Sequence, residues 1–109
     1  MKKETIKVFY KRPGKNLVEV EIPNELEWIQ GAVEGHFEHV QISEDVAMLC
    51  NEEGKLKGMD ANFPLMGDLI VGPVLFVGVD GEEYANCPRN REQMEAFLKL
   101  EEIRERARR

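Results

Sequence analysis

The spacing of hydrophobic residues changes along the chain, and each change marks a predicted element. Residues 17–22 alternate strictly between apolar and acidic side chains, which predicts a strand with one buried face. The apolar run 6–10 precedes it across a Pro-Gly turn at 12–15, so the two runs together predict a β-hairpin. From residue 25 to 34 the apolar spacing becomes helical, and we expect a short helix there.

The ends of this helix carry recognisable signals. Asn24 is a favourable N-cap, and Glu27 three residues later completes a capping-box pattern. Gly35 can adopt the left-handed conformation that closes a helix. The apolar stripe predicted to face the sheet consists of Leu26, Ile29 and Val33. Trp28 points away from that stripe, and we expect it to cover the edge of the sheet.

The second half of the chain predicts further strands and one more helix. The strands are expected at residues 36–42, 46–50, 69–71, 74–79 and 83–85, and the helix begins near residues 88–90. Pro73 cannot donate to a strand ladder, so a bulge or an edge position is expected there. The order is β-β-α-β-β-loop-β-α. Short connections favour an α+β fold with a small, mostly antiparallel sheet and helices packed on one face.

Length and composition predict one soluble unit. A chain of 109 residues supports a single domain, with a core at about residues 5–100 and a basic tail at 103–109 that is expected to fray. No apolar run approaches the roughly 20 residues of a membrane span, and the N-terminus lacks a signal-peptide core. Cys50 and Cys87 do not form a disulfide framework. These features predict a cytoplasmic protein with reduced thiols.

Charge is segregated along the chain, although its net value is only −6. Residues 1–15 carry six Lys and Arg side chains against the single acid Glu4, whereas residues 16–54 carry ten acids and no Lys or Arg. Such segregation steers a cationic partner or repels nucleic acid. The simpler interpretation is a solvated acidic face balanced by basic termini that fold nearby.

The connection at residues 54–68 is the best candidate for a functional segment. Fifteen residues are unusual between the strands of a small domain, and loops of this length tend to be functional. It also holds Met59, Phe63, Leu65 and Met66, which are too apolar for a merely solvated connection. They either plug one end of the sheet or mark a partner surface. The predicted interaction residues are Asn51, Glu52, Glu53, Lys55, Lys57, Asn62 and Phe63.

Other chemistry has weaker support. Glu52 and Glu53 have no third oxygen ligand at a suitable spacing, and His36 and His39 face opposite sides of a strand, so we predict no metal and no cofactor. The two histidines together with Cys50 and Cys87 form a nominal Cys₂His₂ set, but their spacing matches no zinc-finger pattern. Cys50 lies in an apolar run, where a thiol is more often a buried hydrophobe than a nucleophile. Residues 51–54 read as an Asn-x-x-Gly turn, in which Asn51 caps its own backbone and Gly54 supplies a positive φ.

The motifs NELEWIQGAVEG, HFE, LCNEEGKLKG and DLIVG together resemble a family of bacterial domains of unknown function. The resemblance covers residues 5–85, and its most specific part is CNEEGKLKG at 50–58. Members commonly carry Asn-Arg where this chain has Asn62-Phe63. The family is found mostly in phages, plasmids and conjugative elements, so the resemblance implies a mobile-element protein. It implies no particular activity.

These observations favour a small non-enzymatic binding or inhibitor protein that acts on a host partner through residues 51–66. One alternative is a nucleotide-type ligand sponge or sensor with a pocket at an oligomer interface, using Lys55, Lys57 or Arg89. Another is a weak DNA mimic, although fifteen Lys and Arg residues dilute its acidic field. The partner is therefore a host protein or a small ligand. We do not expect the protein to bind a membrane or nucleic acid, and the sequence is compatible with a homo-oligomer.

Overall fold

Two adjacent strands, each an almost unbroken apolar run, form the centre of the protein. In the computed structural model, which describes residues 4–108, β4 (Val46–Asn51) pairs antiparallel with β7 (Val74–Asp80). Every residue of β4 is buried, and so are the first five of β7. A strand buried along its whole length must be covered on both faces of the sheet. Two of the basic residues counted near the N-terminus, Lys2 and Lys3, lie outside the described residues, and so does Arg109, the last residue of the tail that was expected to fray.

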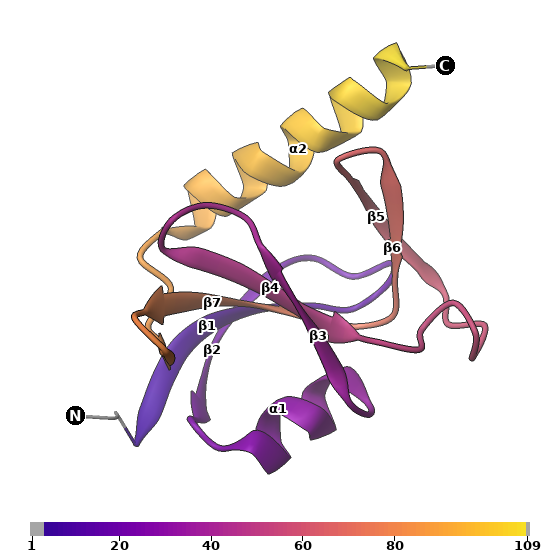
Figure 1. The fold of residues 1–109 in the computed structure, drawn as a ribbon. Helices are drawn as coiled ribbons and strands as arrows, with labels where there is room; N and C mark the ends of the chain where they lie inside the picture. The colour runs from indigo at the N-terminus through magenta and orange to yellow at the C-terminus, as the bar shows by residue number, and fades with distance from the viewer. Residues whose placement is uncertain (1–3, 109) are drawn as a thin grey trace.

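The other strands of the main sheet extend this pair in both directions (Figure 1). Their order is β2-β1-β7-β4-β3, and β8 also pairs with β7. All pairings are antiparallel. The remaining bounds are β1 Thr5–Lys11, β2 Val18–Pro23, β3 Phe37–Gln41 and β8 Glu83–Ala85. The predicted α+β class and mostly antiparallel sheet are confirmed, and β7 joins two sequence-local hairpins into one sheet.

The two helices lie on opposite faces of the sheet (Figure 1). Helix α1 (Leu26–Val33) buries Ile29 against alternate residues of the strands, including Leu49 and Leu75. Helix α2 (Arg91–Ala107) buries Met94 and Leu98 on the face that carries Met48 and Phe76. The expectation that both helices share one face was therefore wrong. The fully apolar β4 and β7 need cover on each side, and one helix lies on each.

The segment expected to be an irregular loop is mostly a β-hairpin. Strands β5 (Ala61–Leu65) and β6 (Asp68–Val71) pair antiparallel in a second, two-stranded sheet on the α2 side. Met66 and Gly67 join them with φ of 49° and 84°, the positive values that a tight hairpin turn requires. Pro73 separates β6 from β7, which belong to different sheets, and forms no bulge within one strand.

The helix ends also differ from the sequence patterns. Asn24 does not cap α1: the N-cap position belongs to Glu25, and no side chain caps the helix there. The Asn24 side-chain amide donates instead to the backbone oxygen of Tyr84 at 3.1 Å. The left-handed residue after α1 is Glu34, with φ of 65°, and not Gly35. A complete capping box occurs instead at the start of α2, between Asn90 and Gln93.

Helix α2 is longer than expected and continues through residues 103–107, which were predicted to fray. Leu26, which was predicted to face the sheet from α1, is exposed instead, and Leu100 on α2 is exposed as well. Within residues 4–108, neither helix combines the length and the apolar character that a membrane crossing demands.

A buried carboxylate connects α2 to the β5–β6 hairpin. Glu101 is only 3% exposed, and its Oε1 accepts a hydrogen bond from the Met66 backbone N–H at 2.6 Å. Its Oε2 accepts one from the Arg104 guanidinium at 3.0 Å. A buried charge is tolerated when it is paired and hydrogen-bonded in this way. The hairpin tip is thereby held against the C-terminal half of α2.

We predict that Glu101→Ala lowers the free energy of unfolding by about 2 kcal/mol, because the Met66 N–H loses its acceptor in a partly buried place. Chemical denaturation monitored by circular dichroism measures this change. Glu95→Ala is the matched control on the same helix, since its ion pair with Arg91 at 3.8 Å is solvent-exposed. Equal losses in the two variants would contradict a clamping role for Glu101.

Candidate functional site

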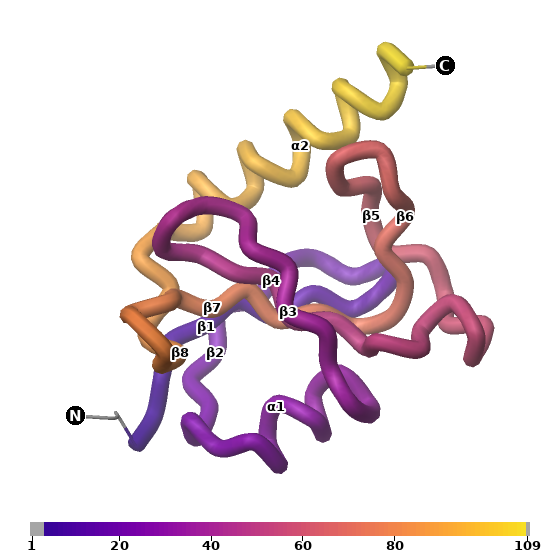
Figure 2. The backbone as a smooth tube through the Cα atoms, in the orientation of Figure 1, coloured from indigo at the N-terminus to yellow at the C-terminus, as the bar shows by residue number. Residues whose placement is uncertain are grey.

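A tight succession of turns at residues 52–58 follows β4 and projects from the end of the sheet (Figure 2). Its backbone is bonded internally, with Lys57 N–H to the Glu53 oxygen at 2.9 Å and Met59 N–H to the Gly54 oxygen at 3.0 Å. The Glu52 N–H also donates to the His36 oxygen at 3.0 Å, which ties the segment to the start of β3. We call it the 52–58 turn.

Asn51 anchors this turn to the end of α1. Its buried side-chain amide donates to the backbone oxygens of Val33 and Glu34, each at 3.1 Å. Its Oδ1 accepts from the Glu53 N–H at 2.8 Å, which confirms that Asn51 caps its own turn. All these bonds are internal, so Asn51 positions the turn and does not itself present a contact surface.

Gly54 is required by close packing and not by its φ, which corrects the sequence expectation. A Cβ atom there would lie 2.8 Å from the Val71 side chain. The left-handed conformation is adopted at Gly58, with φ of 67°. The base of the 52–58 turn therefore sits directly on β6, which further limits its freedom.

The exposed side chains of the turn belong to four predicted residues and to one that was not predicted. Glu52, Glu53, Lys55 and Lys57 are all exposed. Leu56 lies between the two lysines and is 87% exposed, the largest value among the exposed large hydrophobic side chains. The pattern Lys-Leu-Lys was the only sequence signal for it, and one apolar residue in a turn carries little information alone.

Lys55 is held by an ion pair with the hairpin. Its Nζ lies 2.5 Å from Oδ1 of Asp68, the first residue of β6. This hydrogen bond with Lys55 is the main cause that lowers the pKa of Asp68 below its usual value. The pair is solvent-exposed, so it contributes orientation more than stability.

Asn62 and Phe63 are placed away from the exposed turn, in the contact between the hairpin and the main sheet. The Asn62 amide donates to the backbone oxygens of Lys11 and Gly72, and its Oδ1 accepts from Lys11 Nζ at 2.9 Å. Phe63 is 4% exposed, with its ring 5.8 Å from that of Phe76. Both residues fasten β5 in place, and Phe63 is a core residue in this fold.

Of the four apolar residues noted in the predicted loop, some are buried against the sheet and others are exposed, so neither the core interpretation nor the partner-surface interpretation holds for all of them. Phe63 and Leu65 belong to the core cluster that α2 covers. Met59 is half-buried, whereas Met66 is 58% exposed at the hairpin tip. Most of this apolar surface therefore closes one face of the sheet.

The cysteines lie in surroundings that suppress their reactivity. Burial, followed by the nearby charge of Glu38, raises the pKa of Cys50 to about 11. Burial likewise raises the pKa of Cys87. Because the thiolate is the nucleophile, neither site favours thiol chemistry near neutral pH.

The histidines and the acids do not gather into a ligand set. His36 and His39 are both exposed. His39 Nδ1 lies 2.9 Å from the Tyr84 hydroxyl. Among residues 4–108, no three His, Cys, Asp or Glu side chains converge in a way that could hold a metal ion.

A separate hollow lies between α1 and the edge strand β2. This groove of about 670 Å³ is lined by apolar residues of β2 and by Trp28, which is 56% exposed. The sequence argument placed Trp28 at the sheet's edge but identified no groove. An aromatic side chain on the polar side of a short amphipathic helix was the available signal.

We predict that Asn51→Ala destabilises the protein by about 3 kcal/mol, because it leaves buried backbone groups of α1 and the turn without partners. Asn51→Asp should be similarly damaging, since a carboxylate cannot donate to the Val33 and Glu34 oxygens. Thermal denaturation measures both, with the exposed Asn16→Ala as the control. A stability of Asn51→Ala equal to that of the control would refute the anchoring role.

We also predict that Cys50 is protected from thiol reagents in the folded state. In a Cys87→Ala background at pH 8, a disulfide reagent should label Cys50 about 100-fold more slowly than in the guanidinium-unfolded chain, because less of the thiol is ionised and it is buried. Labelling should accelerate as the pH approaches the raised pKa. Fast labelling of the native protein at pH 8 would show that Cys50 is accessible.

Comparison with known proteins gives one family match, which covers most of the chain. Neither a curated protein nor a solved structure matches the chain. A family model described as a domain of unknown function, DUF3846, matches residues 6–102, which include both helices' buried residues and every strand from β2 to β8. The match extends beyond the 5–85 region of the sequence resemblance and covers most of α2. The chain therefore belongs to the DUF3846 family.

Proposed function

We propose that this protein is a small, non-enzymatic binding or inhibitor protein of a phage, plasmid or conjugative element, and that it acts in the cytoplasm on a host protein through the 52–58 turn. The observation that carries the proposal is Leu56. It is 87% exposed and lies at a turn whose backbone is fixed by internal hydrogen bonds.

Rigidity gives an exposed leucine its value in binding. An ordered loop on a firm scaffold loses little conformational entropy when it meets a partner. Asn51 and the close contact of Gly54 with Val71 supply that order before any partner arrives. Leu56 would bury its exposed apolar side chain in a pocket of the partner, and this burial would supply much of the binding energy.

The charges around Leu56 supply specificity. Glu52 and Glu53 lie on one side of it in sequence, and Lys55 and Lys57 flank it directly. Complementary charges on a partner would orient the approach and exclude wrong partners. The ion pair of Lys55 with Asp68 fixes the position of one of these charges.

The chemistry of the neighbouring residues supports binding over catalysis. The Asn51 amide is committed to the Val33 and Glu34 backbone oxygens, and the pKa of Cys50 is raised to about 11. A Cys-Asn pair in these conditions lacks the ionised thiol that a nucleophilic mechanism needs.

The test compares proteins captured from host lysate by the wild type and by Leu56→Asp, with quantitative mass spectrometry as the measurement. We expect at least one host protein to be retained by the wild type and to fall about tenfold or more with Leu56→Asp, because an anchor residue dominates binding energy. Glu52→Lys/Glu53→Lys should reduce capture of the same protein.

Leu100→Asp is the matched control, because Leu100 is an exposed leucine on α2 and its replacement introduces the same charge. All variants must show the wild-type circular dichroism spectrum and melting temperature. Identical partner lists for wild type and Leu56→Asp would overturn the assignment of the turn as the contact surface.

A further inference from the structure

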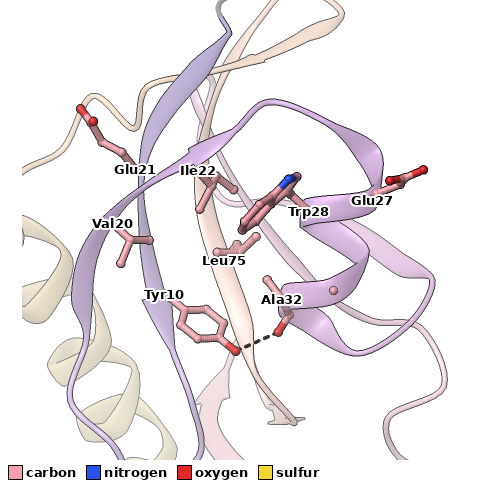
Figure 3. A pocket seen from close by; sticks show the side chains of 9 residues that line it. Tyr10, Val20, Glu21, Ile22, Glu27, Trp28, Ala32 and Leu75 are labelled. Atoms are coloured by element: carbon pink, nitrogen blue, oxygen red, sulfur yellow. Dashed lines mark hydrogen bonds between the residues drawn. The ribbon is translucent and has the colours of Figure 1, made fainter.

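Strand β2 leaves one side of the main sheet open, and a groove runs beside it. Among the residues that the structure describes, 4–108, β2 is the terminal strand of the sheet and pairs only with β1. On the α1 side, Val20, Ile22 and Leu75 line the groove, and Ile22 and Leu75 lie next to Trp28 (Figure 3). The Tyr10 hydroxyl donates to the Ala32 backbone oxygen at 2.9 Å and connects the sheet to the helix at the other end of the groove.

The hydrogen bonds of β1 show which backbone groups of β2 face outward. Lys7 lies opposite Glu21, but its N–H and oxygen bond to Asn86 and Cys87 on the other side of β1. Glu21 is therefore in a non-hydrogen-bonded pair, and its N–H and C=O point away from β1. The same alternation turns the backbone groups of Glu19 outward. These groups form a template on which another strand can pair.

The side chains of β2 give this edge two different faces. Val20 and Ile22 belong to the cluster on the α1 side, while Glu19 and Glu21 alternate with them and point to the opposite face. A strand added at this edge would thus meet carboxylates on one face and an apolar groove on the other. Its own sequence would have to alternate in the same way.

The charge pattern distinguishes between a second copy of this chain and a different partner. In a symmetric antiparallel pair of β2 strands centred on Val20, Glu19 of each copy would lie opposite Glu21 of the other, and such like-charge pairs are destabilising. Basic residues opposite Glu19 and Glu21 would form favourable pairs instead. On the α1 side Glu27 also lines the groove, and no Lys or Arg occurs in residues 16–54.

We propose that β2 and its groove bind an extended, cationic segment of a partner protein, added as a further strand of the main sheet. The basic residues of the segment lie opposite Glu19 and Glu21, and its alternate apolar residues enter the groove beneath Trp28. Main-chain hydrogen bonds to the outward groups of β2 provide affinity, and the alternation of charge and apolar side chains provides specificity.

The groove suits this ligand in its size and lining. Its volume of about 670 Å³ is enough for apolar side chains from an added strand, and its walls include Trp28 and Ala32 of α1. Trp28 is 56% exposed and would lose much of that exposure to water on binding. This surface is separate in sequence from the 52–58 turn, and the inference does not rest on the function proposed for the turn.

The test uses synthetic peptides and the intrinsic fluorescence of Trp28, the single tryptophan of the chain. The first peptide alternates Lys or Arg with Val or Ile. The second has the same residues with all cations in one block, and the third has Glu in place of each cation. We expect the first peptide to shift Trp28 emission to shorter wavelength and to bind about tenfold or more tightly than the other two.

Two variants examine the edge itself. Glu21→Pro removes an outward N–H while leaving the β1–β2 ladder intact, and it should abolish binding of the alternating peptide. Glu19→Lys/Glu21→Lys should lose that peptide and bind the glutamate peptide instead. Glu52→Lys/Glu53→Lys makes the same change of net charge at the turn, and it should bind the alternating peptide like the wild type.

Several results would overturn the proposal. Equal affinity for the alternating and block peptides would indicate general charge attraction, as would equal weakening by the two double lysine variants. Absence of any Trp28 shift at millimolar peptide would exclude the groove as a site for this ligand. A dimer in light scattering that Glu21→Pro converts to monomer would assign the edge to a second copy.

Discussion

The rest of the structure depends on two central strands that are apolar on both faces. β4 and β7 bury almost every side chain, so neither face of the sheet centre can meet water. One face is covered by α1, and the other is covered by α2 together with the β5–β6 hairpin. A sheet covered by a single layer would leave Met48 and Phe76, or Leu49 and Leu75, exposed.

Covering the second face requires polar anchors, because a two-stranded hairpin has little core of its own. Glu101 holds the hairpin tip to α2, and Asn62 holds its other end to Lys11 and Gly72. Asn51 connects the end of β4 to the end of α1 in the same manner. These internal bonds leave the 52–58 turn short and ordered, so the scaffold that closes the core also orders the proposed contact surface.

Local signals predicted the elements better than their partners. The alternation at residues 17–22 and the apolar runs at 46–50 and 74–79 gave strands close to those observed, because burial imposes a period on local sequence. The strand at 69–71 was predicted, but β5 and its pairing with β6 were missed, because Pro64 within β5 and the non-glycine Met66 in the turn are not typical hairpin signals. The sequence placed Asn51 and four charged side chains at the turn after β4, where the structure also has them, and their role in an interaction stays a prediction. Phe63 is a core residue, and neither the exposure of Leu56 nor the β2 groove was anticipated.

The sequence by itself determined the secondary structure of the core, the segregation of charge and the place where an ordered turn leaves β4. It also contained the evidence for two covered faces, since an unbroken apolar strand cannot border water. Only the tertiary structure decided that β7 inserts between β1 and β4, which side each helix covers and which edge stays open. Those outcomes depend on contacts between residues far apart in the chain, such as Phe9 with Phe76 and Met66 with Glu101, and local spacing carries no record of them.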